Sequence, residues 1–159
     1  MIFIALGTQS NDFSRCLKSF EEVIRAFNLE EKVVAQVGNT VYRSPLMESL
    51  EFVSEKEFQG YIEEASVIVT HAGSGALFSA IKKGKKAIAV ARLSQYGEMI
   101  DDHQTELCRK LSEEGYLIDG TYDMAEAWMK VQDFVPRKND FVCSLPKQQT
   151  MQIDMILKK

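Results

Sequence analysis

A histidine and two glycines separate an apolar run from a helical pattern in VIVTHAGSGALFS, residues 67–79. Glycine lets the backbone come close to a bulky anion and adopt positive φ. A helix that begins near Gly75 would point free N–H groups and a partial positive charge at the same place. His71 would donate a further hydrogen bond to a phosphate there. The alternative is an ordinary strand-to-helix turn in which Ser74 caps the helix, and this motif alone does not decide between the two.

Two known phosphate-binding motifs do not match this loop. In the dinucleotide-binding pattern G-x-G-x-x-G, counted from Gly73, the third glycine would fall at Phe78. A Walker A loop needs a G-K-S or G-K-T triplet, and none follows Gly75. If the loop binds phosphate, it must do so through glycine backbone and the helix N-terminus.

A second polar cluster lies in RLSQYGEMIDDHQ, residues 92–104, and comprises Glu98, Asp101, Asp102, His103 and Gln104. Acidic residues favour the first turn of a helix by roughly 0.3–1 kcal/mol each, which would account for the two aspartates. This preference accounts less well for His103 and Gln104. A metal site built from His71, His103 and an aspartate is a third alternative. Its spacing matches no metal-binding motif, and we predict no metal and no cofactor.

The helices and strands that position these residues are indicated by the sequence pattern. Along the chain, apolar runs typical of strands alternate with segments of helical periodicity. Ser54 and Glu57 form a capping-box pattern at the start of one helix. We expect strands at 2–6, 32–37, 50–53, 66–70, 85–91 and 116–118. We expect helices at 13–27, after Ser54, at 75–83, from about 102 to 114, and at 123–133.

This alternation predicts an α/β fold: a doubly wound, mostly parallel sheet with helices on both faces. The strands are apolar throughout, as burial on both faces requires. Ligands of such sheets bind beyond the carboxyl ends of the strands. The loops at 7–10, 71–75 and 92–104 should therefore gather at one edge. We expect one domain over 1–133, and a peripheral tail over 134–159 with a short helix near 151–157.

Composition excludes several classes of protein. The chain has 159 residues, 45% of them hydrophobic and 26% charged, which is ordinary for one globular domain. Its net charge of −4 argues against a general nucleic-acid binder. No apolar run approaches the roughly 18 residues that span a membrane, and MIFIALGTQ resembles a strand more than a signal peptide. Three widely spaced cysteines fit a reducing cytosol.

The segments THAGSGALFSAIKKGKKAIAVAR and YGEMIDDHQTELCRKLSEEGYLI, with the opening strand and its Gly-Thr, resemble the C-terminal domain of family 28 glycosyltransferases. That domain is the Rossmann-like, nucleotide-sugar half of the GT-B fold. The likeness covers roughly residues 1–118. It is greatest to small single-domain subunits of two-component UDP-sugar transferases, of the capsule and exopolysaccharide type and of the dolichol-linked N-acetylglucosamine type.

The resemblance implies a UDP-sugar site and no metal. Gly7 and Thr8 would line the diphosphate. The pyrophosphate would be held by His71, Gly73, Ser74 and Gly75, and the sugar hydroxyls would face Asp102, His103 and Gln104. Many relatives carry a ribose-binding glutamate where this chain has Ser79. Ser79 would make one bond to the ribose but not the pair that a carboxylate makes, so Glu98 is a candidate substitute. The catalytic residue is unknown, with His71, His103 and Glu98 as candidates.

A chain of this length holds one half of a GT-B enzyme. The resemblance therefore implies the donor-binding, catalytic subunit of an inverting transferase that is active only with a partner. The partner would be membrane-anchored, supply the other half and bring a lipid-linked acceptor, so this chain would be cytoplasmic and peripheral to the membrane. The alternatives are a non-catalytic enhancer subunit, a stand-alone nucleotide-binding regulator, and a homodimer whose two copies form the cleft.

Overall fold

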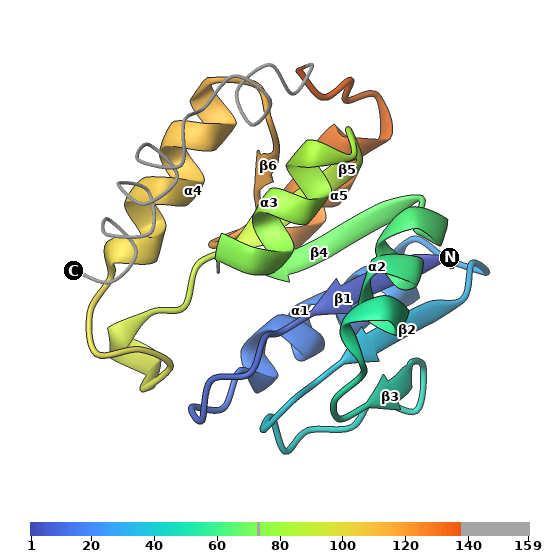
Figure 1. Cartoon of the computed structure of the whole chain (residues 1–159), viewed down its shortest axis with the longest axis vertical. Coiled ribbons are helices and arrows are strands. Elements are labelled where there is room, and N and C mark those ends of the chain that lie inside the picture. The colour runs from blue at the N-terminus through green and yellow to red at the C-terminus, as the bar shows by residue number, and fades with distance from the viewer. Residues whose placement is uncertain (73, 138–159) are drawn as a thin grey trace.

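Six parallel strands form one sheet, in the order β3-β2-β1-β4-β5-β6, within the computed structural model of the protein, which describes residues 1–72 and 74–137 (Figure 1). The strands are β1 (Ile2–Ala5), β2 (Val33–Gln36), β3 (Glu48–Leu50), β4 (Val67–His71), β5 (Lys86–Val90) and β6 (Ile118–Asp119). The helices are α1 (Ser14–Ala26), α2 (Glu55–Glu64), α3 (Ser74–Lys82), α4 (His103–Glu113) and α5 (Met124–Gln132), with a 3₁₀ turn η1 (Ser94–Tyr96). The predicted doubly wound α/β fold is confirmed.

The strand order reverses between β1 and β4. The chain builds outward from β1 through β2 to β3, then returns to the other side of β1 with β4 and continues through β5 to β6. In this kind of sheet the reversal leaves a crevice at the carboxyl ends of the two central strands, where ligands bind. The segments that follow β1 and β4 therefore lie at the place where a site is expected.

The sheet has a separate apolar core on each face, because alternate residues of a strand point to opposite sides. On one face, Ile2 and Ile4 of β1 pack with α1 and α5, whose Phe20 and Trp128 rings meet edge to face with centroids 5.6 Å apart. On the other face, Phe3 and the remaining alternate strand residues pack with α2, α3 and α4. Both faces are thus covered, which explains why the strands are apolar along their whole length.

The helix starts follow the signals in the sequence. The Ser54 hydroxyl accepts a hydrogen bond from the Glu57 backbone N–H at 3.1 Å, so the N-terminal cap predicted for α2 is confirmed. Asp123 caps α5 in the same way, accepting from the Glu126 N–H at 3.0 Å. None of the described helices has the length and apolarity needed to cross a bilayer.

Two strands begin two residues away from where they were expected, whereas the others begin within one residue. The third strand is Glu48–Leu50 rather than 50–53, because it is an edge strand whose position is set by pairing with β2, from Val34↔Glu48 onward, and not by apolarity. The last strand is Ile118–Asp119 rather than 116–118. Tyr116 and Leu117 are instead buried in the core beneath α4. The helix expected near 151–157 lies outside the described residues.

Candidate functional site

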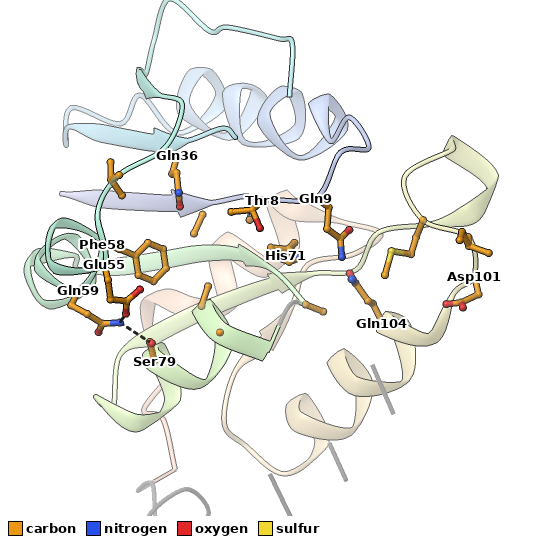
Figure 2. A pocket seen from close by; sticks show the side chains of 18 residues that line it. Thr8, Gln9, Gln36, Glu55, Phe58, Gln59, His71, Ser79, Asp101 and Gln104 are labelled. Carbon is orange, nitrogen blue, oxygen red and sulfur yellow. Dashed lines mark hydrogen bonds between the residues drawn. The ribbon is translucent and has the colours of Figure 1, made fainter. Parts of the chain in front are cut away.

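A pocket of about 720 Å³ opens at the carboxyl edge of the sheet, above the switch between β1 and β4 (Figure 2). Its walls come from the ends of β1, β2 and β4, from α2 and α3, and from the loop between β5 and α4. The labelled side chains in Figure 2 are Thr8, Gln9, Gln36, Glu55, Phe58, Gln59, His71, Ser79, Asp101 and Gln104. All three loops singled out in the sequence contribute to the pocket wall, as expected.

His71 and Gly7 form the floor of the pocket. His71 is the last residue of β4, not part of the following loop, and is only 6% exposed. Gly7 has φ of +80°, and a Cβ there would lie 2.3 Å from His71 Nε2, so the ring packs directly on the glycine backbone. Only glycine meets both conditions without strain.

The imidazole of His71 is neutral at physiological pH. Burial, reinforced by the charge of Arg92, lowers its pKa from 6.5 to about 3. Among the described residues its Nδ1 has no hydrogen-bond partner. A neutral ring is able to donate one hydrogen bond, but it adds no positive charge to a phosphate site.

The loop after β1 is fixed by the turn after β2. Gly38 has φ of +56°, and a Cβ there would lie 2.4 Å from the Gly7 carbonyl oxygen. The Asn39 amide donates to the carbonyl oxygens of Thr8 at 3.3 Å and Gln9 at 3.1 Å. Residues 7–9 therefore lie against a rigid support, and the backbone approach that Gly38 allows was not apparent from the sequence.

The N-terminus of α3 faces the pocket. Gly75, in its first turn, lines the pocket, and no atom lies within 4 Å of the position its Cβ would take. Ala76 and Ser79 also line the pocket from α3. The first N–H groups of a helix have no partner within it, so a helix start that borders a pocket suits an anion. Gly73 lies outside the described residues, and Ser74 begins the helix.

The pocket offers an anion no cationic side chain. No lysine or arginine of the described residues lines it. The described residues also contain no group of three or more His, Cys, Asp or Glu side chains that could hold a metal ion. Negative charge would thus be stabilised here by backbone N–H groups and the α3 dipole.

Glu98 does not line this pocket. Its carboxylate is 3% exposed and accepts hydrogen bonds from Arg15 Nε at 3.1 Å, Arg15 Nη2 at 3.0 Å and the Leu93 N–H at 3.0 Å. Because this side chain is buried and ion-paired with Arg15 of α1, it holds the loop after β5 against α1. In this position Glu98 does not replace a ribose-binding glutamate on the pocket wall.

Arg92 lies beside Glu98 and donates to its carbonyl oxygen at 3.4 Å. Its guanidinium is fully buried and donates to the carbonyl oxygens of Leu6 at 3.0 Å and Asn11 at 2.9 Å. Burial lowers the pKa of Arg92, and the nearby Glu98 charge opposes that shift. The polar core around these two residues joins the loops after β1 and β5, which form two walls of the pocket.

The structure separates the three residues expected to face a sugar. Gln104 lines the pocket, with its Oε1 fixed by the Arg92 N–H at 3.0 Å. Asp102 accepts from the Ser94 N–H at 2.7 Å and is not part of the pocket lining. His103 is also outside the lining, 40% exposed, with Nε2 3.8 Å from a carboxylate oxygen of Asp101. Asp101 does line the pocket.

One wall of the pocket was missed from the sequence. Glu55, Phe58 and Gln59 of α2 line it together with Gln36 at the end of β2. The Gln59 amide donates to Glu55 Oε1 at 2.8 Å and to Ser79 Oγ at 3.2 Å, so it joins α2 to α3 (Figure 2). The available signal was the i, i+3, i+4 spacing, which puts residues 55, 58 and 59 on one helix face.

Comparison with known proteins agrees with this geometry. Residues 1–131 match the model of the glycosyltransferase family 28 C-terminal domain. The human UDP-N-acetylglucosamine transferase subunit ALG13 is 26% identical over 123 residues, which are 73% of this chain but 10% of that protein. This chain therefore spans a small part of that relative's length.

Solved structures share the fold. The calicheamicin glycosyltransferase CalG4 superposes with a TM-score of 0.62 at 17% identity, over 99% of this chain and 43% of CalG4. The solution structure of ALG13 superposes with a TM-score of 0.56 at 14% identity, over 85% of this chain and 87% of that one. With the family match covering most of its length, the chain belongs to the glycosyltransferase family 28 C-terminal domain family.

Proposed function

We propose that this chain binds a UDP-sugar at the switch point of its sheet and acts as the donor-binding subunit of an inverting glycosyltransferase. The observation that carries the proposal is the meeting of the α3 N-terminus with the Gly7 turn on one pocket floor. The human relative is named a UDP-N-acetylglucosamine transferase subunit, which supports both the nucleotide and the need for a second subunit.

Different residues of the pocket bind different parts of the donor in this proposal. The diphosphate lies against Gly75 and the N–H groups of α3, with Gly7 and Thr8 alongside. As the bond to the sugar breaks, charge grows on the leaving diphosphate, and the helix dipole stabilises that charge without a metal. His71 contributes a hydrogen bond from a neutral ring, and Gln104 faces the sugar.

The catalytic base and the acceptor come from a partner subunit in this proposal. Among the three candidates, His71 is too weak a base, because its pKa is lowered to about 3, Glu98 is ion-paired to Arg15, and His103 does not line the pocket. A membrane-anchored partner with a lipid-linked acceptor would hold this chain at the membrane surface. We expect no sugar transfer by the isolated chain. The named relative points to N-acetylglucosamine transfer, and the capsule and exopolysaccharide role has no support from it.

Calorimetric titration of the full chain with UDP tests the donor site. Gly75→Val fills the space in front of the α3 N-terminus and should weaken UDP binding by more than tenfold. Gly60→Val is the matched control, because Gly60 is also a helical glycine with open space around its Cβ position but lies outside the pocket. Equal affinities for UDP in the two variants would refute the assignment of the phosphate to α3.

A further inference from the structure

The wall of the pocket formed by α2 carries a carboxylate, Glu55, that has no role in the proposed donor site. Glu55 lines the pocket at the end near Ser79, away from Asp101 (Figure 2). A carboxylate repels phosphate, yet this one shares a pocket with the helix start that suits an anion. Among the parts of a nucleotide-sugar, this carboxylate suits one that offers hydrogen-bond donors.

Gln59 donates a hydrogen bond to one oxygen of this exposed carboxylate. Its amide donates to Glu55 Oε1 at 2.8 Å and to Ser79 Oγ at 3.2 Å. Within the described residues, Glu55 Oε2 has no hydrogen-bond partner, and the Ser79 hydroxyl accepts a hydrogen bond but donates none. One free acceptor and one free donor thus lie on either side of the Gln59 amide. Neighbouring hydroxyls of a sugar ring, each of which both donates and accepts, match this pair.

Packing keeps the two helices in this register. Phe58, between Glu55 and Gln59 on α2, lies edge to face on Phe3 of β1, with ring centroids 5.7 Å apart. Farther along, Glu63 of α2 forms an ion pair at 3.2 Å with Lys83, the residue after the end of α3. The α2 wall is therefore positioned before any ligand arrives, which reduces the entropy cost of binding.

The spacing along α3 fits the ribose, and Gln104, which faces the transferred sugar in the proposed site, lies at the other end of the pocket (Figure 2). Gly75 and Ser79 are one turn apart on the same face, and four residues of helix rise about 6 Å. A ribose spans such a distance between its 5′ phosphate and its 2′ and 3′ hydroxyls. With the phosphate at Gly75, the ribose hydroxyls reach Ser79 and Glu55.

We infer that Glu55, oriented by Gln59 and joined by Ser79, binds the ribose hydroxyls of the donor nucleotide, so that α2 supplies the carboxylate that α3 lacks. This inference rests on the proposed donor site. It makes Glu55 a specificity-determining residue for ribonucleotides over their deoxy analogues.

A ligand-and-mutant comparison tests it. The full chain is titrated with UDP, 2′-deoxy-UDP and 3′-deoxy-UDP. The parent should bind at least one deoxy analogue about tenfold more weakly than UDP. This is the loss of affinity expected when one charge-assisted hydrogen bond is removed. In Glu55→Gln this difference should shrink to less than threefold. Glu57→Gln is the matched control, because Glu57 is another acid of the first turn of α2 and does not line the pocket.

The outcomes separate the two proposals. If the parent distinguishes ribose from deoxyribose and Glu55→Gln does so equally well, Glu55 is not the ribose ligand, while the donor site stands. If the parent binds all three nucleotides equally, the ribose does not lie on the α2 wall. If the parent binds none of them, the donor site itself is wrong, and the ribose assignment is overturned with it.

Discussion

Replacing Gly7 with alanine tests the packing on which the pocket floor depends. Gly7 has φ of +80°, and its new Cβ would lie 2.3 Å from His71 Nε2. The left-handed backbone costs a non-glycine residue about 1 kcal/mol. Forcing a methyl group into a packed site costs a further 1–3 kcal/mol or so. We therefore expect Gly7→Ala to lower the free energy of unfolding by about 2–4 kcal/mol, a large part of a typical domain's stability.

Urea unfolding of the parent and four variants separates backbone strain from steric overlap. Gly84→Ala is the control for strain alone, because Gly84 has φ of +66° and no atom near its Cβ position, and it should cost about 1 kcal/mol. The overlap term comes from a double-mutant cycle with His71→Ala. Without the ring, Gly7→Ala should cost no more than the control, a coupling of about 1–3 kcal/mol. Equal costs for Gly7→Ala in both backgrounds would show that the ring does not rest on Gly7.

The buried polar residues His71 and Glu98 give two further predictions. Because burial lowers the His71 pKa from 6.5 to about 3, the unfolded chain binds the extra proton in this window. His71 therefore makes stability fall as pH drops from 6.5 toward 3, by at most about 1.4 kcal/mol per pH unit. His71→Asn should remove that dependence in urea titrations at several pH values, whereas His103→Asn, at a 40% exposed site, should not. Glu98→Gln should lower stability by about 2 kcal/mol, since it weakens charged hydrogen bonds from Arg15, yet change UDP affinity less than threefold. A larger loss of UDP affinity in a folded Glu98→Gln protein would return Glu98 to the donor site.

The sequence by itself determined the architecture and the edge of the sheet where the pocket lies. Apolar strands alternating with helical patterns have one stable solution, a parallel sheet covered on both faces, and the loops that follow its strands meet at one edge. The sequence around Ser54 also predicted a helix cap, and the sequence around residues 71–75 predicted a strand-to-helix turn. Both features depend on residues that are neighbours in the chain. Those features rest on periodicity and on short-range hydrogen bonds.

Tertiary structure decided which polar residues face the pocket. Glu98 looked like a free acid in a loop, but Arg15, far away in the sequence, pairs with it once α1 packs beside the loop after β5. Glu55 has no local signal that distinguishes it from other acids at a helix start, and only the packing of α2 beside α3 connects it to Ser79 through Gln59. Side-chain partners depend on distances between elements, and no local pattern encodes those distances.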